Sequence, residues 1–102
     1  LSKKGIDDLK KMAEESLKSV RNCIIALSDN DIDFAEKVIK EEERVDNLEK
    51  QIRGEHMQRL TSGECNPRVG VIFLDALTNL ERVSDHALNV AQGVIGANTT
   101  RN

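Results

Sequence analysis

Apolar side chains recur every three or four residues through three long segments of this chain, and short polar breaks separate the segments. Because an α-helix has 3.6 residues per turn, this spacing places one apolar stripe along each segment. The spacing predicts helices over about residues 3–28, 31–62 and 67–95, each packing through its stripe. The stripes are Ile6, Leu9, Ala13, Leu17, Val20, Ile24 and Leu27; Phe34 or Ala35, Val38, Val45, Leu48, Ile52, His56 and Leu60; and Val69, Phe73, Ala76, Leu80, Val83, Ala87, Val90 and Val94.

The polar breaks carry residues that end and start helices. Asn30 or Asp31 can cap the second helix by accepting hydrogen bonds from its free N–H groups. Gly63 can take the left-handed conformation that follows a helix, and Asn66 with Pro67 suits the start of the third helix. Connections of about four residues cannot carry the chain back to its start, so neighbouring helices are antiparallel. The sequence therefore predicts an all-α protein, an antiparallel up-down-up three-helix bundle.

Length and composition narrow the classes of protein further. A chain of 102 residues suits one domain, predicted over residues 1–96 with a polar tail over 97–102. A net charge of −3 and the absence of Trp and Tyr speak against nucleic acid as a partner. No apolar run approaches the roughly 20 residues that cross a bilayer. Because the chain begins at Leu1, we expect it to be a piece of a longer protein.

Acidic residues interrupt the packing lines of the second and third helices. Glu81 and Asp85 lie four residues apart on one flank, and Glu42, Asp46 and Glu49 share one side of the second helix. Antiparallel helices that turn near residue 65 bring together positions whose numbers sum to roughly 130. The two acidic ladders are thus predicted to meet at the same height, where carboxylates repel and something positive is expected between them.

Two sources of positive charge could neutralise these acids. The protein's own cations Lys50, Arg53 and Arg82 can neutralise a solvated acidic flank. A metal ion is the other candidate, since all-oxygen ligand sets suit hard cations such as Mg²⁺, Ca²⁺, Mn²⁺ and ferric iron. The spacing of the residues leaves both open.

Particular motifs carry a resemblance to a known family. The segment 79–91 reads NLERVSDHALNVA and resembles the third-helix signature of the PhoU family, with Glu81 and Asp85 as its E-xxx-D pair. Glu42 and Asp46 resemble the family's other acid motif. The sequences HMQRL at 56–60, GEC at 63–65 and FLD at 73–75 are similar to the PhoU-like cytoplasmic domain of bacterial sodium/phosphate cotransporter family proteins. The resemblance covers about residues 6–95.

The resemblance implies both a function and a site. Family members fold as three-helix repeats, usually paired, bind metal ions or iron or zinc clusters, and act in phosphate transport and its regulation. It implies Glu42, Asp46, Glu81 and Asp85 as metal ligands, and the facing-height argument adds Glu49. We expect Mg, Mn, Zn or Fe as the metal. The expected partner is a phosphate transporter or the membrane part of the parent chain, at the cytoplasmic face, with a homodimer or a second repeat.

Other functions were weighed against this one. One is a structural helical module for dimerisation or protein interaction without metal. Another is histidine phosphotransfer through His86, which Asp85 and Glu81 oppose by repelling a phospho-aspartate donor. A carboxylate-bridged di-iron oxidase needs Glu-x-x-His pairs, and neither His56 nor His86 has a Glu three residues before it. We therefore expect no enzymatic activity.

Overall fold

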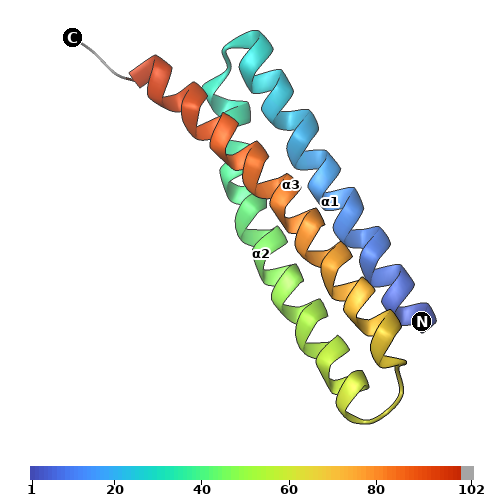
Figure 1. Cartoon of the computed structure of the whole chain (residues 1–102). Coiled ribbons are helices and arrows are strands. Elements are labelled where there is room, and N and C mark those ends of the chain that lie inside the picture. The colour runs from blue at the N-terminus through green and yellow to red at the C-terminus, as the bar shows by residue number, and fades with distance from the viewer. Residues whose placement is uncertain (100–102) are drawn as a thin grey trace.

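The computed structural model describes residues 1–99, which form three long helices (Figure 1). They are α1 (Lys3–Asp29), α2 (Ile32–Thr61) and α3 (Pro67–Thr99). Each helix packs against both others along a rod with extents of 58 × 20 × 17 Å. The predicted all-α up-down-up bundle is thereby confirmed. No helix within residues 1–99 is long and apolar enough to cross a membrane.

The residues at the two turns set the helix ends as their chemistry predicts. Asn30 takes a left-handed conformation with φ 52° and ends α1. The carboxylate of Asp31 then caps α2 by accepting from two backbone N–H groups at 2.9 and 3.3 Å. At the other turn Gly63 has φ +81°, and Asn66 accepts from the backbone N–H of Arg68 at 2.9 Å. Two short, capped turns therefore fix the antiparallel order.

Helix α3 continues to Thr99, beyond its predicted end near residue 95. Asn98 exchanges two amide hydrogen bonds with Asn30 at 2.6 and 2.7 Å and donates a third to the carbonyl of Val94 at 2.8 Å. These bonds tie the last turn of α3 to the connection between α1 and α2. Residues 97–99 of the predicted tail are thus helical. Residues 100–102 of that tail lie outside the described part.

The core divides into two clusters of different character. At the end that holds the α1–α2 turn, the packing residues are mostly small, with Ala26 and Ala91 fully buried. Toward the other end the residues are larger, with Met12, Phe73 and Leu77 at 2% exposure or less. Small side chains bring helices close, while large ones supply most of the buried apolar area.

The predicted packing stripe of α1 is wrong in large part, although Leu9 and Val20 of that stripe are partly buried and pack against the core. Leu17, Ile24 and Leu27 are 54%, 57% and 64% exposed. Small and hydroxyl side chains occupy the interior instead, because α1 packs close to its neighbours: the Ser16 hydroxyl donates to the carbonyl of Leu80 at 3.0 Å. The buried residues of α1 are Gly5, Asp8, Met12, Ser16, Ser19, Cys23 and Ala26.

The predicted stripes of α2 and α3 agree with the structure better than that of α1. Helix α2 buries most of its predicted stripe. Helix α3 buries three of its eight predicted positions and half-buries three more, which are Val69, Ala76 and Leu80. Val83 and Val90 are the exceptions, at 39% and 37% exposure, because they lie on the flank of α3 that faces α1 and reaches solvent. Confirmed core residues are Ala35, Val38, Val45, Ile52, His56, Phe73, Ala87 and Val94.

His56 is a core histidine, as predicted. Its ring is fully buried, stacks on Phe73 with 4.1 Å between centroids, and places Nε2 3.2 Å from the carbonyl oxygen of Gly70. A Cβ at Gly70 would lie 2.6 Å from Leu60 Cδ2 and 3.2 Å from that Nε2. Any other residue at this position would therefore displace the Leu60 side chain or the His56 ring. Burial lowers the pKa of His56, which favours the neutral imidazole.

Candidate metal centre

Two antiparallel helices place the predicted acids on facing sides. Glu42, Asp46 and Glu49 stand four and three residues apart on α2, so they follow one side of that helix. The guanidinium of Arg53 donates to Thr78 Oγ1 at 3.0 Å and joins α2 to α3 one turn beyond Glu49. This register brings the α2 acids to the height of the acid pair on α3. We call Glu42, Asp46, Glu49, Glu81 and Asp85 the acidic cluster.

Three members of the acidic cluster converge most closely. One carboxylate oxygen each from Asp46, Glu49 and Glu81 lie within 4.8 Å of one another. Glu49 is buried at 6% exposure, while Asp46 and Glu81 are half-buried. Oxygens at such separations surround a volume in which a cation would contact all three.

Glu42 and Asp85 form the other part of the cluster. The Ser84 hydroxyl donates to Glu42 Oε2 at 2.9 Å. Burial, followed by the neighbouring carboxylates of Asp85 and Asp46, raises the pKa of Glu42 to about 7, against the opposing effect of the Ser84 hydrogen bond. Asp46 therefore belongs to both parts of the cluster: it lies close to Glu49 and Glu81, and its charge helps to raise the pKa of Glu42.

The pKa of Glu81 is raised in the same way as that of Glu42. Burial, and after it the charges of Glu49 and Asp85, raises the pKa of Glu81 to about 7. A carboxyl group with such a pKa holds its proton for part of the time at neutral pH. The cluster thus carries more negative charge than its surroundings neutralise.

Two basic side chains neutralise part of the cluster. Lys50 Nζ lies 3.2 Å from Asp46, and Arg53 Nε lies 2.5 Å from Glu49. Within residues 1–99, no Lys or Arg reaches ion-pair distance of the other three carboxylates, and Arg82 makes no ion pair there. The protein's own cations therefore balance two of the five acids.

The donor set fits a hard metal ion. All five side chains offer carboxylate oxygens, which Mg²⁺, Mn²⁺ and ferric iron prefer, and Zn²⁺ also accepts carboxylate. A bound cation would lower the pKa values of Glu42 and Glu81 by stabilising their charged forms. The ion would link α2 to α3.

Two residues near the acids were not foreseen. Ser84 bonds Glu42, and Thr78 bonds Arg53. Both hydroxyls lie on the α2-facing side of α3, and a search for polar residues on that side would have found them. Neither histidine joins the group: His56 is bonded to Gly70, and His86 is exposed.

Comparisons with known proteins point to one family. The sequence profile of the PhoU domain matches residues 9–94, a range that contains the whole acidic cluster. No solved structure gives a significant match.

Three curated relatives carry matching names. The chain is 31% identical over 97 residues to the "Phosphate-specific transport system accessory protein PhoU homolog 1" of Thermotoga maritima, covering 95% of this chain and 42% of that protein. It is 28% identical to the PhoU homolog of Clostridium acetobutylicum, covering 85% and 42%. It is 29% identical to that of Xylella fastidiosa, covering 85% and 37%. The chain spans less than half the length of these relatives. It belongs to the PhoU family.

Proposed function

We propose that the acidic cluster binds a metal ion and that the chain serves as an accessory, regulatory module in phosphate transport. The observation that carries the metal proposal is the approach of the Asp46, Glu49 and Glu81 oxygens to within 4.8 Å of one another. The raised pKa values of Glu42 and Glu81 support it, because burial and neighbouring carboxylates disfavour the charged forms that a cation would stabilise.

The ion's role in this proposal is structural and electrostatic. Asp46, Glu49 and Glu81 would hold it, with Glu42 and Asp85 able to hold a second or to complete the first. Its positive charge would offset the repulsion between α2 and α3 and stabilise their register. No chemical step on a substrate is part of this function, and we propose that the chain is not an enzyme.

The transport role rests on family membership. The curated relatives are named accessory proteins of phosphate-specific transport systems. We propose that this chain acts at the cytoplasmic face of the membrane, beside a phosphate transporter or as part of a sodium/phosphate cotransporter-type parent. In either setting the bundle would regulate the transporter through direct protein contacts and not through catalysis.

An exposed apolar surface supports pairing with a second three-helix unit. The Ser16 to Leu80 hydrogen bond sets α1 and α3 in register, and helix periodicity then places Leu17 near Val83 and Ile24 near Val90 at the edge of their groove. Contiguous exposed apolar area of this kind marks interaction surfaces. We call these four residues and Leu27 the apolar row, and we propose a second copy of the chain or another repeat as its partner.

Sedimentation velocity tests the pairing. The isolated chain is expected to form a dimer that the double variant Leu17→Ser, Ile24→Ser converts to a monomer. The exposed Val71 lies on a different side of α3, so Val71→Ser serves as the matched control and should leave the dimer intact. A wild-type chain that stays monomeric at high concentration would contradict self-pairing.

Elemental analysis tests the metal site. The untagged protein is exposed separately to Mg²⁺, Mn²⁺, Zn²⁺ and iron, dialysed, and assayed for bound metal. We expect stoichiometric metal in wild type, none in the double variant Asp46→Asn, Glu81→Gln, and wild-type content in the exposed control Glu36→Gln.

The same assay decides on the alternative function, a helical interaction module without metal. The ion pairs of Lys50 with Asp46 and of Arg53 with Glu49 favour that alternative, because they neutralise two acids without a metal. Equal, negligible metal in all three proteins would refute the metal site and leave the interaction module.

A further inference from the structure

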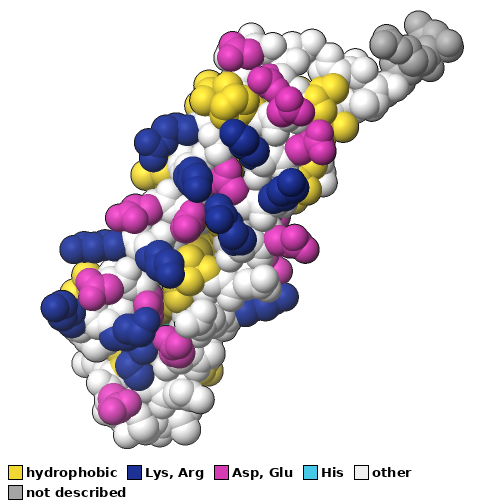
Figure 2. Space-filling model, turned by 180° about the vertical axis from the view of Figure 1, so that it is seen from behind, with side chains coloured by type: hydrophobic (Ala, Val, Ile, Leu, Met, Phe, Trp, Pro, Cys, Tyr) yellow, Lys and Arg dark blue, Asp and Glu magenta, His cyan; other side chains and the backbone are white. Residues whose placement is uncertain are grey.

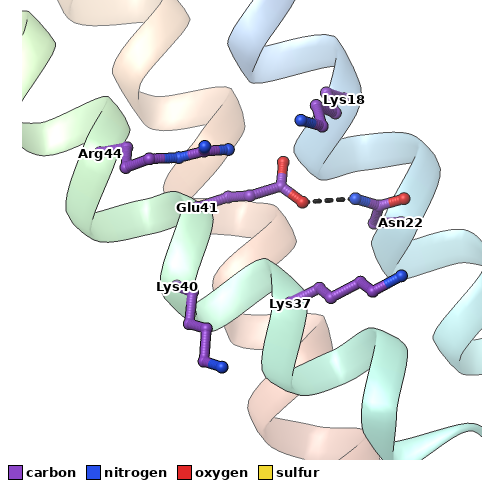
Figure 3. Close-up of a pocket in the computed structure, with 6 residues that line it drawn as sticks. All are labelled: Lys18, Asn22, Lys37, Lys40, Glu41 and Arg44. Atoms are coloured by element: carbon purple, nitrogen blue, oxygen red, sulfur yellow. Dashed lines mark hydrogen bonds between the residues drawn. The ribbon is translucent and has the colours of Figure 1, made fainter.

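On the opposite side of α2, four basic side chains from α1 and α2 and one buried carboxylate line a cavity. The cavity between α1 and α2 has a volume of about 560 Å³ and is lined by Lys18, Asn22, Lys37, Lys40, Glu41 and Arg44, which we call the basic pocket. Figure 3 shows Lys18 and Arg44 reaching toward the Glu41 carboxylate, while Lys37 extends toward α1 below Asn22 and Lys40 points away along the surface. One cation from each helix thus points at the buried carboxylate, and two more line the cavity.

Local spacing explains the convergence. Lys37, Lys40, Glu41 and Arg44 stand at intervals of three and four residues and share one face of α2. Lys37 also lies over the ring of Phe34, with Nζ 4.3 Å from the centroid, which holds the ammonium in place.

The positive charge of the pocket is not balanced locally. Glu41 is 5% exposed and accepts hydrogen bonds from the amide of Asn22 and, at 3.5 Å, from the hydroxyl of Ser19. In the described part of the chain, no carboxylate lies within ion-pair distance of any of the four cations. Neutral groups thus bind the one acid, and the pocket keeps an excess of positive charge.

The hollow next to the basic pocket differs from it in charge. The adjacent hollow on α1 contains two acids, Glu14 and Glu15, and two cations, Lys18 and Arg21. Lys18 lines both hollows. Apart from it, the adjacent hollow has one cation against two acids, whereas the basic pocket has three cations against one carboxylate. Figure 2, which views the molecule from behind, shows Lys and Arg side chains along the middle of that face, with Asp and Glu side chains among them. The excess of basic side chains therefore lies on the α2 side of the shared Lys18.

We propose that the basic pocket binds a small, multiply charged phosphate compound of the diphosphate or triphosphate class. Lysine and arginine side chains bind phosphate oxygens through charge-assisted hydrogen bonds. Several cations at the edges of one cavity match an anion with several charges better than one with a single charge. A cavity of about 560 Å³ also exceeds the size of a lone orthophosphate. Nothing in this site depends on the metal proposed for the acidic cluster.

Isothermal titration calorimetry with pyrophosphate, in metal-free low-salt buffer, tests the proposal. Wild type is expected to bind pyrophosphate saturably, at least about tenfold more tightly than orthophosphate, with an affinity that falls as salt rises. The double variant Lys18→Gln, Arg44→Gln should lose about tenfold or more in affinity, because two charge-assisted contacts disappear. Both residues are exposed, so circular dichroism should show an unchanged fold.

Two further variants make the test specific. Glu41→Gln keeps an acceptor for Asn22 but removes the opposing charge, so it should bind pyrophosphate more tightly than wild type. The exposed Lys10→Gln removes one charge of the same sign outside the pocket and should change the affinity less than about twofold. Equal weakening by Lys10→Gln and by the pocket double variant would overturn the proposal, because binding would then follow net charge.

Vesicles separate a soluble ligand from a lipid headgroup. Phosphatidylcholine vesicles containing phosphatidic acid present the same phosphate chemistry on a surface. Saturable binding of soluble pyrophosphate that the pocket variants weaken supports the proposal. Binding to these vesicles with no response to pyrophosphate, or no binding to either, overturns it.

Discussion

Helix α2 carries opposite charge imbalances on its two sides. Toward α3, the acidic cluster has five carboxylates and only two paired cations. Toward α1, the basic pocket is lined by four cations and a single carboxylate. A formal net charge of −3 for the whole chain conceals both. The kind of ligand that each groove can bind therefore depends on the balance of charges within that groove, and not on the net charge of the chain.

The largest expected effect comes from breaking the core on which both grooves rest. Leu77 is fully buried among Met12 and Phe73, so Leu77→Ala should lower the free energy of unfolding by about 2–5 kcal/mol through lost contacts and a cavity. Urea unfolding measures it. The exposed Ile72 gives the control Ile72→Ala, expected to cost less than about 0.5 kcal/mol. Similar losses for both variants would place the core elsewhere.

Next in size is removal of a cation from the acidic cluster. Arg53→Gln should lower the unfolding free energy of metal-free protein by about 1–2 kcal/mol, because it leaves the buried Glu49 without its partner. Lys50→Gln removes the same charge from a solvent-exposed pair with Asp46 and should cost less than about 0.5 kcal/mol. Equal costs in urea unfolding would show that burial of Glu49 does not matter.

Removing carboxylate charge should have the opposite sign. The pKa values of Glu42 and Glu81 are raised to about 7 in the fold, so their contribution to stability is complete below the unfolded value of 4.5 and is lost as pH rises through 7. The double variant Glu42→Gln, Glu81→Gln should therefore stabilise metal-free protein by on the order of 1 kcal/mol near pH 8 and by less near pH 5. A gain that is larger at the lower pH would contradict the repulsion.

The smallest expected effect belongs to His56, outside both grooves. Burial lowers its pKa below the unfolded value of 6.5, so the unfolded chain takes up a proton first and stability falls as pH drops below 6.5. In the Glu42→Gln, Glu81→Gln background, this slope should be present with His56 and absent with His56→Gln. Chemical denaturation at several pH values measures the slope, and an unchanged slope in the variant would assign it to other groups.

The sequence predicts the antiparallel order of α2 and α3 and their facing heights well, for a physical reason. Short capped turns fix the antiparallel order, and a turn near residue 65 fixes which heights face each other. The approach of Glu81 to Asp46 and Glu49 follows from those two facts. The metal itself stays a prediction, because carboxylate spacing alone does not distinguish an ion from the ion pairs of Lys50 and Arg53.

Helix α1 and the basic pocket show what the sequence pattern misses. Large apolar residues such as Leu17 and Ile24 indicate one stripe, but the interior takes small residues such as Ser19 on another face. Which stripe is buried depends on how closely neighbouring helices approach, a tertiary property. The pocket is missed for a related reason, because Lys18 joins Lys37 only once α1 and α2 are packed.

The most direct test of the account is to measure metal and pyrophosphate binding in the same two variants. Glu81→Gln, in the acidic cluster, should lose metal and keep the wild-type affinity for pyrophosphate. Lys18→Gln with Arg44→Gln, in the basic pocket, should do the reverse. Calorimetry of each ligand alone, with circular dichroism to confirm the fold, gives the four values. Loss of both ligands in one folded variant, or binding that neither variant changes, would contradict two separate sites on the two sides of α2.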